Sequence, residues 1–553
     1  MIIKNINISK KITFFLFLTF FFVGIFTFKD YGITIDEEFQ RASGFYWLNY
    51  VLNFTPFENL KSIVDKLILK PREFTLPPPE TYNQWGTIFD LPMAFLEVIL
   101  EVKDPKNYYH LRHLFNFLIF FISSIFFFKL LFNRFLNYNV SIIGTLFYVL
   151  SPRIYGNSFY NNKDLIFLSL LTIALYFCFK LFNKIKFKNL FFFSFFAAAC
   201  SASRVLGIFL IMSFFIFYLL SISPKTKKFD ALIPLFTCCT LYLFFLILLW
   251  PYLWSDPLNN FVSAFKFFSK HYLDIKMLFD GEYIRSHNLP YSYILKWIFI
   301  TTPILYVLLF VYGYMRVFNR FFRRLVNIEN GKIHNDFWLG INEKKDLFML
   351  ANLTGILFFL ILFKTALYTG WRHVYFLNIF IIYLSTVSFY QIGIYLKRKF
   401  KNKFHYHISI LFILTVIYKM IVYHPFQSFY FNNYFKNISH EKFEIDYWGL
   451  SGKKFLKDLL NAEKNKNNIS VGVASYLPLG RSVYLLEKEN RKKITIVGQN
   501  FKESDYIYTN FISEVGKFKN YKYEIPKNFS LKSEFIIDNI KIYEVYKKKE
   551  NKN

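Results

Sequence analysis

The sequence predicts a mainly α protein, a polytopic bundle of about eleven transmembrane helices followed by a small extracytoplasmic α/β domain. Three observations predict this class. Apolar residues make up 54% of the 553 residues, 76 of them Phe, and fall in long blocks. Short runs of Lys and Arg separate these blocks. After about residue 437 the blocks give way to alternating apolar and polar residues, a pattern typical of strands.

The apolar blocks are long enough to cross a bilayer, which needs roughly 20 apolar residues per helix. Residues 12–28, 114–132 and 231–250 meet this length. No small-x-small cleavage site follows Phe28, so we expect a retained first span rather than a signal peptide. We expect further spans at residues 140–150, 294–313 with a kink at Pro303, 347–363 and 408–423. Two more spans are expected to begin at residue 165 and at about residue 376, and two short spans are expected to meet at an outer turn around 201–204.

The net charge of +30 would suggest nucleic acid for a soluble protein. Here the basic residues instead gather at alternate membrane exits, as at Lys10 and Lys11, residues 184–188 and residues 316–324. This is the positive-inside pattern. It predicts an integral inner (plasma) membrane protein with a cytoplasmic N-terminus, an extracytoplasmic C-terminal domain and no nucleic-acid partner.

Two domains are expected, a membrane domain over residues 1–435 and an α/β domain over 436–553. Long external loops are predicted at 30–109 and 151–164, and the half-apolar stretch 85–102 suits a helix lying along the membrane surface. Strands are expected at residues 469–474, 493–497, 506–508 and 535–546. The four cysteines lie in apolar stretches without metal-type spacing, so we interpret them as packing residues.

Candidate functional residues gather in the predicted external loops. Asp36 and Glu37 follow the first span, where acidic side chains are costly to desolvate without a partner or a task. The second loop carries Arg153, Lys163 and Asp164 among many hydrogen-bonding side chains.

Two further cationic positions lie at predicted membrane exits. Adjacent Arg372 and His373 occupy the mouth of a span, where a bound anion such as phosphate would stabilise both. Arg204 lies at an outer turn, where it would bind an anion or simply snorkel to the interface.

Sequence motifs in and near these loops together resemble those of a known family. The motifs are GITIDEEF at residues 32–39, SPRIYGNSFYNNKD at 151–164, SRVLGI at 203–208, WPYLWSDP at 250–257, TTP at 301–303, TGWRHVYF at 369–376 and FEIDYWGLSGKK at 443–454. The chain resembles the membrane-embedded GT-C glycosyltransferases that take sugar from a polyprenyl-phosphate carrier, in the protein mannosyltransferase and aminoarabinose transferase group. The motifs cover most of residues 32–454, and the rest of the C-terminal domain lies outside them.

The resemblance implies inverting transfer of a sugar to an envelope acceptor at the outer membrane face. By position in the motifs, Asp36 would be the catalytic base and Asp164 would help to shape the site. Arg372 and His373 would hold the carrier phosphate, and Arg204 and Arg153 would contact phosphate or sugar. Glu37 and Lys163 are expected substrate contacts that tune the protonation of Asp36. Lipid, glycan and protein acceptors all remain open.

Two other classes of function remain open from the residues. A transporter or flippase of a lipid-linked sugar would use the same charges without breaking a bond, although alternating access favours a midplane site and internal repeats, which this sequence lacks. A structural protein of the envelope would leave the acidic and Arg-His loops without a role. No cofactor is predicted; a divalent cation near the carboxylates is compatible with the sequence, but no ligand set is defined.

Overall fold

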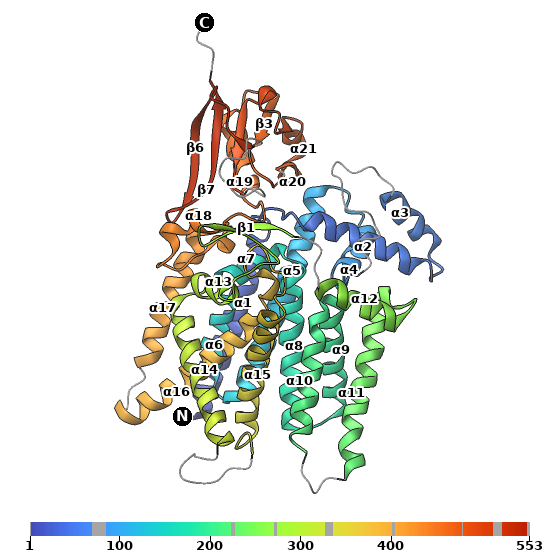
Figure 1. The fold of residues 1–553 in the computed structure, drawn as a ribbon, viewed down its shortest axis with the longest axis vertical. Coiled ribbons are helices and arrows are strands. Elements are labelled where there is room, and N and C mark those ends of the chain that lie inside the picture. Colours follow the sequence, from blue (N-terminus) through green and yellow to red (C-terminus); the bar gives the residue numbers. More distant parts are fainter. Residues whose placement is uncertain are drawn as a thin grey trace.

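The computed structural model describes residues 2–68, 84–222, 227–269, 274–326, 336–400, 404–477, 479–512 and 523–549. A long helical bundle occupies most of the molecule, and a small sheet domain covers one of its ends (Figure 1). The N-terminus lies near the opposite end of the bundle. We call the end beneath the sheet domain the sheet end.

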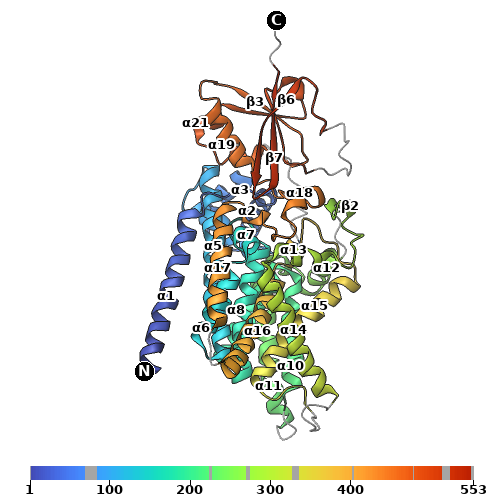
Figure 2. The same ribbon diagram turned by 90° about the vertical axis from the view of Figure 1, so that its left-hand side faces the viewer.

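Eight of the described helices are long and apolar enough to cross a membrane, and three shorter apolar helices accompany them. The long helices are α1 (Ile2–Thr27), α5 (Pro105–Phe135), α8 (Asp164–Asn183), α11 (Lys228–Leu249), α14 (Ile304–Leu325), α15 (Ile341–Leu362), α16 (Leu377–Phe400) and α17 (Phe404–Val422). The shorter ones are α6 (Tyr138–Val149), α9 (Phe187–Ser203) and α10 (Ile208–Leu219). The predicted polytopic bundle is therefore confirmed. Helix α8 lies at its centre and α1 at its edge, with 78% and 6% of their apolar windows buried (Figure 2).

The predicted span at residues 294–313 is not one kinked helix. Helix α13 (Tyr293–Thr301) ends before Pro303, and α14 begins after it. Thr302 is extended, with φ −104° and ψ 140°, because the ring of a following proline disfavours the helical conformation. The expectation of a continuous span was wrong at this point.

Several short elements gather at the sheet end. They are α2 (Glu37–Leu52), α3 (Glu58–Ile68), α4 (Asp90–Ile99), α7 (Pro152–Tyr160), α12 (Pro257–Ser269), α18 (Ser439–Lys442), and the antiparallel pair β1 (Lys276–Phe279) and β2 (Glu282–Arg285). Helix α4 confirms a helix within residues 85–102.

The predicted loop at residues 151–164 instead contains helix α7. Pro152 occupies its first turn, where a missing N–H costs nothing, and all nine residues of the helix are buried. Its polar side chains find partners inside the protein, as when Asn157 Nδ2 donates to the Arg153 carbonyl at 2.9 Å. The hydrogen-bonding side chains that marked this segment as a candidate functional loop therefore belong largely to a buried helix.

The C-terminal domain contains a five-stranded sheet in the order β4-β3-β5-β7-β6. Strands β3 (Ile469–Val473), β4 (Ile494–Gly498) and β5 (Tyr506–Thr509) are parallel, and the hairpin of β6 (Phe529–Ile537) and β7 (Ile540–Lys548) adds antiparallel strands. Helices α19 (Gly452–Ala462), α20 (Gly480–Val483) and α21 (Lys488–Arg491) complete the domain.

One strand prediction in this domain was wrong. Residues 535–546 are not a single strand, because Asp538 and Asn539 form the turn of the hairpin with φ of 48° and 69°. Two successive residues with positive φ are typical of a tight two-residue hairpin turn.

The sheet domain is joined to the bundle by ion pairs between their facing surfaces. Arg481 contacts Glu38 at 2.9 Å, and Arg491 contacts Asp104 at 2.8 Å. At the hairpin turn, Asp538 accepts from Lys419 at 2.7 Å and from Lys436 at 3.0 Å. The domain therefore contacts both the segment between α1 and α5 and the last long helix of the bundle, α17.

Candidate active site

Asp36 lies at the sheet end, at the start of helix α2. The turn before it is fixed by Glu37, whose carboxylate accepts from the Thr34 N–H at 2.7 Å and lies 2.9 Å from His113 Nε2. The Asp36 side chain itself is 35% exposed. A carboxylate that is held at its backbone and still open to solvent can exchange a proton with a bound molecule.

Arg372 is the partner of Asp36, although 336 residues separate them in the chain. Its Nη1 donates to Asp36 Oδ2 at 2.5 Å. Arg372 opens the short helix η5 (Arg372–Val374), after Gly370 with φ of 74°. That left-handed conformation favours glycine and turns the chain so that Arg372 faces Asp36.

Arg204 and Asp164 form a second ion pair near the first. Asp164 is buried, and its Oδ2 also accepts from Asn161 Nδ2 at 2.9 Å. Among the described residues, Nε of Arg204 and Nε of Arg372 are buried without a hydrogen-bond partner. Buried guanidinium N–H groups of this kind remain available to a bound anion.

Lys163 lies between these two pairs. Its ammonium is 3.8 Å from the centre of the Trp85 ring. Burial lowers the pKa of Lys163 to about 7, while Asp90 and Asp36 act to raise it and Arg204 and Arg372 act to lower it. The charges of both ion pairs are therefore within electrostatic reach of Lys163.

A cavity of about 590 Å³ opens beside these charges. Among the described residues that line it, the ionisable side chains are all basic: Lys163, Arg204 and His373. Its remaining walls are mostly apolar and come from η2 (Val205–Gly207), α10, α12 and α15, including Phe209, Phe265, Phe268, Ile356, Phe359 and Phe363. We call it the basic cavity. It suits a molecule with an anionic head and a long apolar tail.

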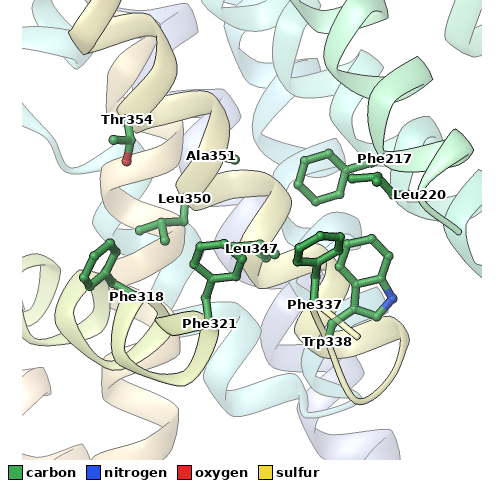
Figure 3. A pocket seen from close by; sticks show the side chains of 10 residues that line it. All are labelled: Phe217, Leu220, Phe318, Phe321, Phe337, Trp338, Leu347, Leu350, Ala351 and Thr354. Atoms are coloured by element: carbon green, nitrogen blue, oxygen red, sulfur yellow. The ribbon is translucent and has the colours of Figure 1, made fainter. Parts of the chain in front are cut away.

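A second cavity, of about 270 Å³, lies between α10, α14 and α15 and has a different character (Figure 3). Its described lining is apolar apart from Thr354 and the indole nitrogen of Trp338. We call it the apolar cavity. It provides a control site, with hydrophobic walls but no cation for a charged head group.

The structure brings most of the predicted site residues together. Asp36, Lys163, Asp164, Arg204 and Arg372 form one cluster, and His373 lines the basic cavity. Arg372 contacts Asp36 directly, whereas the sequence hypothesis had assigned it with His373 to the carrier phosphate. Glu37 and Arg153 are placed elsewhere. Glu37 is buried against Thr34 and His113.

Arg153 lies outside the described lining of the basic cavity, and its Cζ is 5.2 Å from the ring centre of Trp297 and 4.7 Å from that of Phe431. Its Nε donates to the Tyr430 carbonyl at 3.0 Å, while Nη1 and Nη2 are buried and meet no acceptor in the described part of the chain. Cation–π contacts with these two rings compensate part of the cost of burying this charge.

Sequence reasoning missed several residues of the site. Trp448 stacks on the Arg372 guanidinium, with 4.4 Å between Cζ and the ring centre, and Trp85 covers Lys163. Asp90 accepts from Arg112 at 3.2 Å and from Asn162 at 2.8 Å. Burial raises the pKa of Asp90 to about 6. The sequence carries no periodic signal for such contacts.

No group of three or more His, Cys, Asp or Glu side chains is placed to hold a metal ion, as far as the described ranges extend. The carboxylates of the site are instead paired with arginines.

The helical bundle defines an integral membrane protein. At one end of its helices, the basic cavity presents both cationic side chains and apolar walls to a bound molecule. Residues 111–253 match the family model described as dolichyl-phosphate-mannose-protein mannosyltransferase. This match confirms the expected resemblance for the region that contains Arg153, Lys163, Asp164 and Arg204. No curated protein matches the chain in sequence.

Solved structures of low identity were also found. ArnT from Cupriavidus metallidurans bound to undecaprenyl phosphate is similar at 10% identity and a TM-score of 0.45, over 96% of each chain. The apo state of the same protein gives 10% identity and a TM-score of 0.45, over 98% of this chain and 97% of that one. The Archaeoglobus fulgidus oligosaccharyltransferase tethered with an acceptor peptide gives 10% identity and a TM-score of 0.39, over 76% of this chain and 56% of that one.

Proposed function

We propose that this protein is an inverting glycosyltransferase that moves a sugar from a polyprenyl-phosphate carrier to an envelope acceptor at the outer face of the membrane. The observation that carries the proposal is the basic cavity beside Asp36. Its volume of about 590 Å³ falls in the range of about 300–1,000 Å³ typical of small-molecule sites. The match of residues 111–253 to a mannosyltransferase family model supports the same class.

The carrier phosphate would bind at the basic end of the cavity. Lys163, Arg204 and His373 line this end, and the buried Nε of Arg204 is available as a donor. The first isoprene units would lie among Phe209, Phe359 and neighbouring apolar side chains. Cations at this position also stabilise the charge that develops on the leaving phosphate.

Asp36 would act as the general base. Arg372 holds Oδ2, so we assign Oδ1 to the acceptor hydroxyl. As Oδ1 takes the hydroxyl proton, the acceptor oxygen forms a bond to the anomeric carbon from the face opposite the phosphate. The bond from that carbon to the phosphate oxygen breaks, and the carrier monophosphate leaves with the electron pair. Holding both partners in line is worth roughly 7–11 kcal/mol of the barrier.

The proposed orientation, with the sheet end at the outer face of the membrane, rests on the distribution of basic residues. The basic runs at residues 184–188 and 316–324 lie away from the sheet end, as the bounds of α8, α9 and α14 place them (Figure 1). The positive-inside rule then assigns the sheet end, with Asp36, to the outer side.

The test is sugar transfer by membranes that contain the wild type, Asp36→Asn or Asp30→Asn. Asp30 is a matched control, because it lies in the same loop and is half exposed beside His424. With labelled polyprenyl-phosphate sugars as donors, we expect Asp36→Asn to lose about 100-fold or more of the rate, and Asp30→Asn to keep it.

Equal expression and equal unfolding midpoints establish that the variants are folded. Transfer by Asp36→Asn at the wild-type rate would remove Asp36 from the mechanism. If the wild type transfers no sugar from any donor but moves a lipid-linked sugar across vesicle membranes, the protein is a transporter and the proposal fails.

A further inference from the structure

The segment at residues 446–453 connects the sheet domain to Asp36, and we call it the bridging segment. Its first residue, Asp446, is fully buried. The Asp446 carboxylate accepts from the backbone N–H of Leu450 at 2.8 Å and of Ser451 at 3.1 Å. These bonds close the segment into a tight turn.

The sheet domain fixes this turn from one side. The hydroxyls of Ser451 and of Tyr508 on β5 are 2.6 Å apart, and Asn510 Nδ2 donates to the Asp446 carbonyl at 3.1 Å. The bridging segment therefore follows the position of strand β5.

On its other side, the bridging segment touches both members of the Asp36–Arg372 pair. The Trp448 carbonyl accepts from the Ile35 N–H at 3.2 Å, directly before Asp36. The indole of the same residue covers the Arg372 guanidinium at 4.4 Å. Trp448 is 3% exposed, so this contact lies inside the protein.

The chain around Asp36 also packs tightly against the bridging segment. A Cβ at Gly32 would lie 2.6 Å from the Leu450 carbonyl oxygen, so only glycine allows this approach. Lys453 Nζ donates to the Tyr31 carbonyl at 3.1 Å. Residues 31–36 and the bridging segment thus behave as one unit.

We infer that the sheet domain positions the Asp36–Arg372 pair through the bridging segment, with Trp448 as the positioning residue. This inference rests on the proposed function, because it assigns the domain a role in the same reaction. Trp448 fixes the backbone at Asp36 and the plane of Arg372 at once, so its loss disturbs the orientation of the base. The described lining of the basic cavity includes neither Trp448 nor Arg372, and its cations are Lys163, Arg204 and His373, so we expect donor binding to stay unchanged.

The test is steady-state transfer kinetics for Trp448→Ala, Trp448→Phe and the control Trp254→Ala. Trp254 lies at the same end but packs against the rings of Tyr50 and Phe54 instead of an arginine. We expect Trp448→Ala to lower kcat about 100-fold, the scale of a misplaced catalytic group, with the donor KM unchanged. Trp448→Phe keeps an aromatic face over Arg372 and retains most of kcat, and Trp254→Ala behaves as the wild type.

A second variant keeps the test informative if Trp448→Ala does not fold. Tyr508→Phe removes only the hydroxyl that contacts Ser451, and we expect a smaller fall in kcat, again without a change in donor KM. Binding of undecaprenyl phosphate to each purified variant, measured by native mass spectrometry, should match the wild type.

The outcomes separate this inference from the proposed function. An active wild type with equal kcat in Trp448→Ala overturns the positioning role alone. A raised donor KM or weaker undecaprenyl phosphate binding in Trp448→Ala also overturns it, because Trp448 would then serve the donor site. A wild type without transfer activity from any donor overturns the proposed function, and the positioning role with it.

Discussion

Two ionic clusters lie at opposite ends of the bundle, and they differ in how completely their charges are paired. In the first, which we call the Asp346 cluster, one fully buried carboxylate accepts from Arg134 at 2.6 and 2.7 Å, from Arg320 at 2.9 Å and from Tyr383 at 2.8 Å. It joins α5, α14, α15 and α16. All of these donors point at one carboxylate.

The second, which we call the Asp36 cluster, contains Asp36, Lys163, Asp164, Arg204 and Arg372. Each of its two aspartates pairs with one arginine, and buried N–H groups of both arginines meet no acceptor among the described residues. The basic cavity opens beside it. Because buried charges need compensation, a complete cluster indicates a structural role, whereas an incomplete one beside a cavity indicates a binding site.

The largest effect is expected from a substitution in the Asp346 cluster, to which the comparison assigns a structural role. Asp346→Asn removes the charge of the fully buried carboxylate that pairs with the partly buried Arg134 and Arg320, so we expect it to lower the free energy of unfolding by about 3–5 kcal/mol. Thermal unfolding in detergent measures this effect, with Asp30→Asn as the exposed control. An unchanged midpoint for Asp346→Asn would contradict the structural assignment of this cluster.

For the Asp36 cluster, the comparison predicts that anion binding depends on pH. Because burial lowers the pKa of Lys163 to about 7, the protonated ammonium that binds an anion is lost as the pH rises through 7. We therefore expect the affinity for undecaprenyl phosphate to be highest below pH 7 and to fall above it, by up to about tenfold per pH unit.

Lys163→Met tests whether this titration belongs to Lys163. The variant should bind undecaprenyl phosphate about tenfold more weakly at pH 6, the scale of a lost charge-assisted hydrogen bond. It should also lose the dependence between pH 6 and pH 8. A variant that keeps the wild-type pH profile would show that another group titrates.

The smallest expected effect compares the two cavities. Phe359→Ala removes part of an apolar wall of the basic cavity, and we expect it to weaken undecaprenyl phosphate binding by about 1 kcal/mol. Phe321→Ala makes the same change in the apolar cavity (Figure 3) and should leave binding unchanged. Equal losses in both variants would mean that the carrier does not distinguish the cavities by charge.

Much of the fold was predictable, because long apolar blocks admit few structures in a membrane protein. The blocks at residues 12–28, 114–132 and 231–250 correspond to α1, α5 and α11. Helix α7 was missed because a hydropathy pattern cannot reveal that a polar segment is buried, with Asn157 and Ser158 bonded to carbonyls of their own helix. The hairpin of β6 and β7 was read as one strand because alternation continues across its two-residue turn.

The sequence singled out the residues of the Asp36 cluster, but not the geometry in which they meet. Asp36 and Arg372 were each expected near the reaction, yet their pairing depends on how two distant loops meet. Glu37 was expected at the substrate because it adjoins Asp36, but the turn of the chain at this point directs it to His113. Trp448 lies in the motif at residues 443–454, but nothing in its sequence neighbourhood reveals a distant arginine.

The bridging segment has a consequence for biogenesis. Residues 31–36 leave the ribosome hundreds of residues before residues 446–453, which they contact through Ile35 and Tyr31. In a nascent chain, residues 31–36 therefore lack these contacts until residues 446–453 have been synthesised and placed beside them.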